Sequence, residues 1–212
     1  MLALQPWHRM ILVVVLGGVG VSLLAWKAHT DPAINYLPHH RDAEWIIFPT
    51  AVDARGHLAA SLDTTFRHEF TLQHKPVSAR LALRAMCRAE LKVDGASIEL
   101  PHVRNWKDVS DVDITGQLRD GTNTIEVRVF NQNGPPALWL VLDADQLNVG
   151  TGRTWQASFA GSSWRNAVLA SEERIPGPGN PSASRETTFD AAKKLWPLWI
   201  LLIGIACAGV IL

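Results

Sequence analysis

Cysteine and surplus charge are both scarce in this sequence. Its 212 residues include only two cysteines, and 20 basic residues balance 20 acidic ones. Cys87 falls in a predicted soluble strand and Cys207 in a predicted membrane segment, so we expect no disulfide within one domain. Proteins that bind nucleic acid normally carry a basic patch. The neutral balance therefore gives no reason to expect nucleic acid as a partner.

The chain also lacks the short motifs of common catalytic and metal sites. It has no His-Glu-x-x-His, no Gly-x-Ser-x-Gly, no phosphate-binding loop and no paired-cysteine zinc pattern. The densest histidine group, His39 and His40 with Asp42, is interpreted as a solvated linker rather than a metal site. Asp111 and Asp113 could bind calcium through oxygen ligands, but a plain polar loop is the preferred interpretation. We expect no enzyme activity, cofactor or metal, unless the chain is part of a longer enzyme.

Long apolar runs occur only near the two ends of the chain. The first, Met10 to Trp26, contains no charge and is just long enough to cross about 30 Å of hydrocarbon. A signal peptide would end in a cleavage site of small residues, and Leu23-Leu24-Ala25 is a poor version of one. The pattern therefore favours an uncleaved membrane helix over residues 10–27.

The second apolar run, Leu195 to Leu212, is also uncharged and close to membrane length. Trp196 and Trp199 stand at its start, where aromatic side chains prefer the membrane interface. We expect a juxtamembrane turn and a second membrane helix over 189–212. The sequence stops without a polar tail, so the helix either ends in the far leaflet or belongs to a longer protein.

Two spans around a folded domain place both termini on the same side of a cell membrane. A first anchor of this kind usually leaves its short N-terminus in the cytoplasm, which predicts an extracytoplasmic location for residues 28–194. Small residues four positions apart let membrane helices approach closely. The predicted packing positions, facing the partner helix or another membrane protein in the bilayer, are Gly18, Ser22, Gly204 and Ala208.

Between the apolar ends, the pattern changes to short strands separated by turns. Apolar and polar residues alternate from Phe66 to Gln73, which is typical of a half-buried strand. On that strand His68 falls on the apolar side and is interpreted as a hydrogen-bonded core residue. Asp94-Gly95 is a strong signal for a tight hairpin. The run from Ala137 to Leu142 is continuously apolar, as expected for a strand covered on both faces.

Six to eight strands at this spacing favour a mainly β fold, a sandwich or barrel. The sandwich is predicted for residues 43–168. The remaining segments are a short tail at 1–9, a linker at 28–42 and a second linker, rich in Pro, Gly and Ser, at 169–188.

Several short motifs resemble those of one group of β-sandwiches. They are Ala43-x-Trp45-Ile46, Phe66-Arg67-x-x-Phe70, Ala79-x-Leu81-x-Leu83-x-Ala85, Leu91-x-Val93-Asp94-Gly95, Trp106, Leu118-x-x-Gly121-x-Asn123-x-Ile125-x-Val127-x-Val129-x-Asn131, Gly134-Pro135-Pro136-Ala137-Leu138 and Trp155. These segments resemble the galactose-binding-domain-like jelly rolls, in particular the accessory N-terminal domains of rhamnosidase-type and β-galactosidase-type glycoside hydrolases. Some members of that group bind sugars and many are structural spacers, so the resemblance implies a fold more firmly than a function.

A sugar site needs aromatic platforms and polar groups that contact hydroxyls. Trp155 suits core packing better than stacking on a ligand, whereas Trp164 lies in a Gly/Ser loop and is a surface candidate. The predicted ligand-binding residues are Trp164, Arg165, Arg153, Trp106 and Asn105.

The preferred hypothesis is a membrane-anchored extracytoplasmic sandwich that acts as a non-catalytic carbohydrate- or protein-binding accessory module. One alternative is a structural subunit of a larger membrane complex. Another is the N-terminal region of a longer membrane enzyme or sensor, cut at residue 212. The expected partners are the lipid bilayer, a membrane protein and a glycan ligand.

Overall fold

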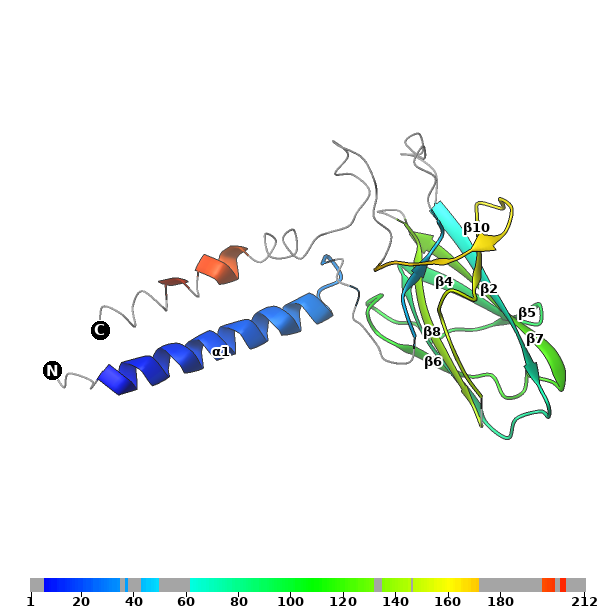
Figure 1. Cartoon of the computed structure of the whole chain (residues 1–212), viewed down its shortest axis with the longest axis horizontal. Helices are drawn as coiled ribbons and strands as arrows, with labels where there is room; N and C mark the ends of the chain where they lie inside the picture. Colours follow the sequence, from blue (N-terminus) through cyan, green and yellow to red (C-terminus); the bar gives the residue numbers. More distant parts are fainter. Residues whose placement is uncertain are drawn as a thin grey trace. The chain divides into compact units, whose positions relative to one another are not determined.

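A computed structural model describes residues 6–34, 37, 43–49, 62–131, 135–145, 147–171, 196–200 and 203–204. The chain divides into two compact units. One comprises Met1–Pro38 with Arg185–Leu212, and the other comprises His39–Ser184. Figure 1 shows the helix of the first unit and the strands of the second.

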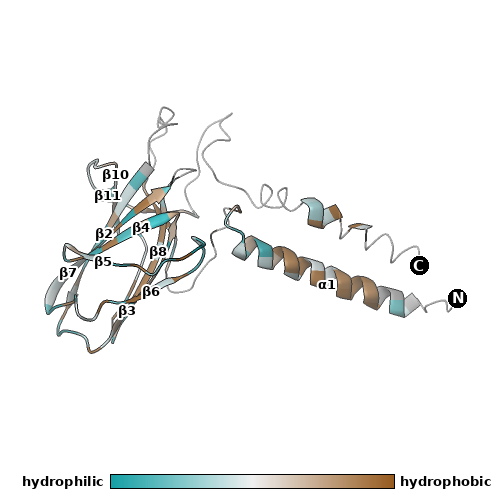
Figure 2. Ribbon diagram, turned by 180° about the vertical axis from the view of Figure 1, so that it is seen from behind, coloured by the Kyte–Doolittle hydropathy of each residue, from teal (hydrophilic) through white to brown (hydrophobic). Residues whose placement is uncertain are grey.

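The first unit contains a long apolar helix, α1, which spans Pro6–Thr30. Within it, Ile11–Thr30 is long and apolar enough to cross a membrane. Its large apolar side chains are exposed, for example Val14 at 67% and Val21 at 61%, and Figure 2 shows the apolar colour along the middle of the helix. A core helix of a soluble protein would bury such side chains. The predicted apolar helix near the N-terminus is therefore present, and it is longer than the predicted span.

The predicted second membrane helix lies mostly outside the described residues. Residues 196–200 and 203–204 are helical, and Trp196 and Trp199 are exposed at 61% and 43%. Leu198 packs against Leu24 and Ile34 of the same unit. A second transmembrane helix is not shown by these short pieces.

The predicted helix-packing residues show no close backbone approach in the described parts of the chain. A Cβ atom added to Gly18 or Gly204 would meet nothing within 4 Å. The Ser22 hydroxyl donates a hydrogen bond of 2.8 Å to the Gly18 carbonyl within α1. Ala208 lies outside the described residues, so helix packing at these four positions stays a prediction.

The second unit is a sandwich of two six-stranded antiparallel sheets (Figure 1). Sheet I runs in the order β12 (Val168–Leu169), β1 (Ile46–Ile47), β8 (Ala137–Ala144), β3 (Ala79–Met86) and β6 (Ser110–Asp113), with β9 (Leu147–Gly150) also on β8. Sheet II runs in the order β11 (Arg165–Asn166), β10 (Gln156–Phe159), β2 (Leu62–Leu72), β7 (Gly121–Asn131), β4 (Arg88–Val93) and β5 (Ala96–Ile98). Most connections between consecutive strands cross from one sheet to the other. The prediction of a mainly β sandwich is confirmed.

A single core lies between the sheets, and the predicted alternation builds it. Phe66 and Val127 of sheet II and Leu81 and Leu140 of sheet I are almost fully buried in one cluster. Phe66 and Val127 face each other directly in the β2–β7 register. The polar residues that follow them along each strand, Arg67 and Arg128, point outward. This confirms the alternation seen in the sequence.

Strand β8 is covered on both faces, as its continuous apolar run predicted. Leu138 and Leu140 face the core, and Trp139 is only 3% exposed on the other side. The Trp139 indole N–H donates a hydrogen bond of 3.1 Å to the Ala43 carbonyl. The outer face of sheet I is therefore closed around this side chain.

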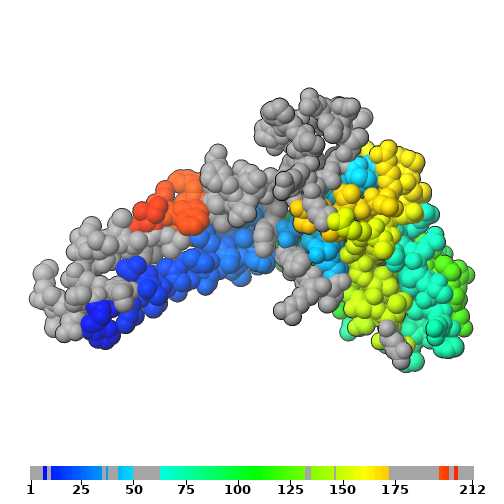
Figure 3. Space-filling view, viewed as in Figure 1, coloured from blue at the N-terminus to red at the C-terminus, as the bar shows by residue number. Residues whose placement is uncertain are grey.

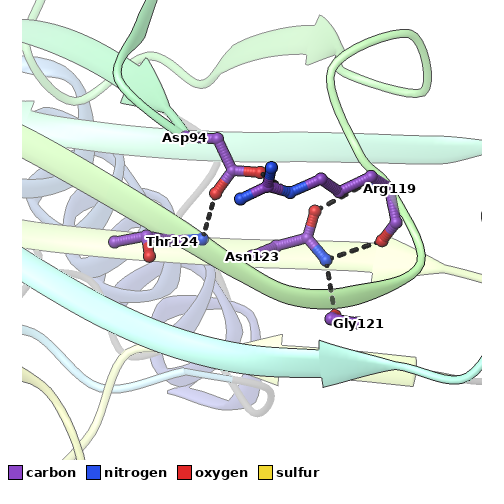
Figure 4. Close-up of polar contacts among 5 residues, drawn as sticks. All are labelled: Asp94, Arg119, Gly121, Asn123 and Thr124. Carbon is purple, nitrogen blue, oxygen red and sulfur yellow. Dashed lines mark hydrogen bonds and ion pairs between the residues drawn. The ribbon is translucent and has the colours of Figure 1, made fainter.

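The predicted hairpin at Asp94-Gly95 joins β4 to β5. Both residues have positive φ angles, 47° and 81°, which is the backbone that a two-residue turn of this kind requires. The Asp94 carboxylate accepts a hydrogen bond of 2.8 Å from the Thr124 amide and forms an ion pair with Arg119, as Figure 4 shows. These contacts fix the hairpin to the start of β7.

Asn123 holds the loop that leads into β7 (Figure 4). Its side chain is fully buried, and its oxygen accepts a hydrogen bond of 2.9 Å from the Arg119 amide. Its nitrogen donates to the carbonyls of Arg119 and Gly121 at 2.8 and 2.9 Å. A buried amide satisfied in this way is structural.

Candidate functional site

The turn between β10 and β11 presents the most exposed tryptophan of the sandwich unit among its described residues. Trp164 is 38% exposed. The turn has left-handed backbone at Ala160 and Gly161, and the Ser162 hydroxyl accepts a hydrogen bond of 3.1 Å from the Phe159 amide. The segment around residue 160 lies on the surface of the unit in Figure 3. These local contacts order the turn that carries Trp164.

Arg67 supports the Trp164 ring from the outer face of sheet II. Its guanidinium carbon lies 4.2 Å from the ring centroid, which is close cation–π geometry. Its Nη2 donates a hydrogen bond of 2.8 Å to Oε1 of Gln156 on the neighbouring strand. We call Arg67, Trp164 and Gln156 the Trp164 plate. The plate is partly exposed, and its own contacts fix it in place.

A second arginine–aromatic contact lies on the same face. The guanidinium carbons of Arg128 and Arg88 lie 4.7 and 4.4 Å from the Phe130 ring centroid. Both Nε and Nη2 of Arg128 lie 2.7 Å from Oδ2 of Asp63. We call Arg128, Phe130, Asp63 and Arg88 the Phe130 plate. Like the first plate, it is held by a side-chain acceptor on an adjacent strand.

Arg165 and Arg153 are exposed but belong to neither plate. Arg165 lies opposite Ala157 in the β10–β11 register, and its guanidinium carbon is 5.9 Å from the Phe48 ring. Arg153 lies in the turn that precedes β10. Their predicted ligand roles stay predictions, although Arg165 is adjacent to Trp164 in the chain.

Trp106 and Asn105 lie in the loop before β6, a strand of sheet I. Trp106 is 8% exposed and packs edge-on against Trp45, with ring centroids 6.1 Å apart. The Asn105 carboxamide oxygen accepts a hydrogen bond of 3.0 Å from the Lys107 amide and shapes this loop. The structure thus does not bring these two candidates together with Trp164.

His68 lies on the core side of β2, as predicted. Its ring stacks on the buried Trp155 ring at 5.1 Å and 15°. Burial lowers the pKa of His68, while a hydrogen bond to the Thr154 backbone and the nearby Glu69 carboxylate oppose this shift. A neutral, stacked imidazole is a packing element here.

The two aspartates considered as calcium ligands, Asp111 and Asp113, make local contacts. Asp111 forms an ion pair of 3.4 Å with Arg80. Asp113 accepts a hydrogen bond of 2.9 Å from the Thr115 amide, and its hydrogen bonds to Thr115 lower the pKa of this carboxyl. Across the described part of the chain, no three His, Cys, Asp or Glu side chains are grouped to hold a metal ion. The group at residues 39–42 lies outside the described residues.

Sequence reasoning missed Arg67, Gln156, Arg128, Phe130 and Asp63. The alternation from Phe66 onward placed Arg67 on the polar side of a strand. The contact with Trp164 depends on the β2–β10 register, in which Arg67 faces Gln156. That register joins segments about 90 residues apart, and the sequence contains no local signal for it.

No protein-family model matches this chain, and no curated protein matches it. Among solved structures, it is similar to an α-L-rhamnosidase of Streptomyces avermitilis complexed with L-rhamnose, with a TM-score of 0.52 and 22% identity over 66% of this chain. It is also similar to a GH78 family rhamnosidase of Bacillus sp. GL1, with a TM-score of 0.49 and 26% identity over 57% of this chain. A lectin of Pleurotus ostreatus has a TM-score of 0.45 and 19% identity over 61% of this chain.

These similarities cover a small part of the enzymes. The chain covers 16% of the Streptomyces enzyme and 14% of the Bacillus enzyme. The similarity to the Streptomyces enzyme shows a shared β-sandwich fold, which supports the resemblance drawn from the sequence motifs. At this level of identity it carries no activity over to this chain.

Proposed function

We propose that this protein is a membrane-anchored, non-catalytic carbohydrate-binding module built on a galactose-binding-like jelly roll. The observation that carries the proposal is the Trp164 plate. Trp164, which is 38% exposed, lies on a folded sandwich, and the Arg67 guanidinium carbon lies 4.2 Å from its ring centroid.

The chemistry of the plate suits a sugar. One face of a sugar ring presents C–H groups, which pack against an aromatic ring, while its edge presents hydroxyls. Tryptophan supplies a large apolar surface with a polar N–H. Asn166 on β11 faces Gln156 of the plate on β10, and the two side chains offer amide donors and acceptors. A few polar groups placed around an apolar platform are typical of small-molecule sites.

The exposed apolar surface of α1 supports the membrane anchor. Trp7 and Trp26 are 54% and 65% exposed, and the 19 residue steps between them correspond to roughly 28 Å of helix. That length matches the hydrocarbon core, and tryptophan prefers its two interfaces. The anchor, a second span over 189–212 and an extracytoplasmic sandwich together form the proposed arrangement. A membrane protein that packs against the helices is its proposed partner.

The test applies the full chain, purified in detergent, to a glycan array. Trp164→Ala removes the ring and should lower the affinity for bound glycans by at least about tenfold. Trp164→Phe retains an aromatic platform and should retain much of the affinity.

Val77→Ala is the matched control, because Val77 is 91% exposed and belongs to neither plate. It should leave binding unchanged. Absence of binding to every glycan, or equal binding by wild type and Trp164→Ala, would contradict the proposed function.

A further inference from the structure

The two plates lie at neighbouring positions on the outer face of sheet II. In the β2–β7 register, Arg67 faces Glu126 and Thr65 faces Arg128. Arg67 and Arg128 are therefore diagonal neighbours across two strands, with Cα atoms about 7–8 Å apart. Their guanidiniums stack on different rings, Trp164 and Phe130. The two rings thus flank a short polar stretch of the sheet.

We propose that the two plates form consecutive subsites for one neutral oligosaccharide that lies across β10, β2 and β7. The inference rests on the proposed function and specifies its ligand: a chain of at least two sugars, rather than a single sugar, without carboxylate, sulfate or phosphate groups.

Both plates are already assembled and partly accessible: Trp164 is exposed and Phe130 is half-buried. The side chains of Arg128 and Arg88 are 50% and 70% exposed. Thr65, which lies between the plates, is half-buried and offers a hydroxyl. The Arg128–Asp63 pair places two N–H donors beside a carboxylate acceptor at 2.7 Å. Such a pair can donate to one sugar hydroxyl and accept from its neighbour.

The charge pattern of this face favours a neutral ligand. The outward positions of β2, β7 and β4 carry four basic and four acidic side chains. They are Arg67, Arg88, Lys92 and Arg128, and Asp63, Glu69, Glu90 and Glu126. Arg128 is ion-paired with Asp63, and Arg88 lies 3.9 Å from Glu90. An anionic sugar would meet as many carboxylates as cations and gain little from charge.

The outer face of sheet I offers no comparable surface among the described residues. Ala137, Trp139 and Ile47 on that face are 2%, 3% and 7% exposed. The Arg84 guanidinium carbon lies 5.0 Å from the Trp139 ring, but that ring is buried. Among the described residues, the partly exposed aromatic rings on an outer sheet face are therefore those of sheet II.

The experiment measures the affinity of the full chain in detergent for glycans of increasing length, from single sugars to oligosaccharides, in neutral and acidic series. Affinity for the neutral series should rise about tenfold when a second plate can be reached. Raising the salt concentration should change that affinity less than twofold, since no net charge is involved.

Two substitutions separate the subsites. Phe130→Leu removes the second ring at similar volume, and Asp63→Asn removes the carboxylate that fixes Arg128. Each should lower the affinity for the oligosaccharide about three- to tenfold and leave single-sugar binding unchanged. The melting temperature and circular dichroism spectrum of each variant show whether it has folded.

The outcomes distinguish the inference from the function beneath it. Binding that needs Trp164 but shows no length dependence, or is unaffected in folded Phe130→Leu and Asp63→Asn proteins, overturns the two-subsite inference and leaves the function standing. Binding to acidic glycans alone, with strong salt dependence, overturns the neutral ligand class. No binding to any glycan overturns both proposals.

Discussion

At the residue scale, His68 shows how the sandwich uses a titratable side chain for packing. The imidazole lies on the core side of β2 and stacks on Trp155, which is fully buried. Burial penalises the charged form of the ring. The pKa of His68 is accordingly lowered from its usual value of 6.5. The core therefore favours neutral imidazole, and this makes stability depend on pH.

The sandwich should lose stability as the pH falls below 6.5 because of this residue. In that range the unfolded chain binds a proton that folded His68 does not, so stability rises with pH. The contribution is full above the unfolded pKa of 6.5 and is lost progressively down to the lower folded pKa. His68→Gln should show a smaller drop in melting temperature between pH 8 and pH 5 than wild type. His74→Gln, at an exposed position, is the control and should behave like wild type; equal drops in all three proteins would contradict the assignment.

At the element scale, the β4–β5 hairpin depends on two residues with positive φ. Gly95 has a φ of 81°, and a Cβ added there would meet nothing within 4 Å. Any cost of a side chain at Gly95 must therefore come from the backbone alone. Residues with a Cβ disfavour this region, whereas glycine enters it freely.

Replacing Gly95 with alanine should destabilise the sandwich by about 1 kcal/mol through backbone strain. Gly152→Ala is a matched control, because a Cβ there also meets nothing within 4 Å and its φ is not in the left-handed region. Denaturant unfolding followed by tryptophan fluorescence measures both. A Gly95→Ala protein as stable as Gly152→Ala would show that the hairpin tolerates the substitution and that the turn geometry is not limiting.

Elements with a local pattern could be predicted from the sequence. The alternation around Phe66, the Asp94-Gly95 turn and the apolar run of β8 each depend on residues close together in the chain. Each is present in the structure. What covers the second face of β8 could not be predicted, because Trp139 bonds to Ala43, 96 positions away.

Of the residues in the candidate site, only the most exposed one, Trp164, could be predicted from the sequence. Trp164 lies in a Gly/Ser turn and is exposed, as the composition of that turn indicated. Trp106 has a similar polar setting in the sequence, yet it is buried against Trp45. The two tryptophans differ in exposure because their loops border different strands, and the position of each strand depends on long-range pairing. The plate partners Arg67 and Arg128 were missed for the same reason.

At the scale of the whole molecule, the chain combines an apolar helix with a sandwich that has its own core. The proposed extracytoplasmic location of the sandwich can be tested at its own cysteine. Cys87 is exposed and free, and Cys207 lies outside the described residues. Partial burial raises the pKa of the Cys87 thiol, so labelling with a thiol reagent is best carried out at mildly alkaline pH.

A membrane-impermeant maleimide should label Cys87 in intact cells. The reason is that the proposed topology places the sandwich outside the cytoplasm. Cys87→Ser is the control and should abolish the labelling, which rules out Cys207 as its source. Labelling that occurs only after the cells are permeabilised would place the sandwich in the cytoplasm and contradict the proposed topology.

The hydrogen bonds that fix the two plates also determine at which step the side chains of Arg67 and Arg128 lose conformational entropy. Ordering a long side chain costs up to about 2 kcal/mol of conformational entropy. Arg67 is held by Gln156 and Arg128 by Asp63, so this loss accompanies folding and not the arrival of a ligand. Gln156→Ala should then weaken ligand binding mainly by releasing Arg67. On this account, the arginines of sheet II are pre-organised by folding, and a ligand binds them without the entropy cost of ordering their side chains.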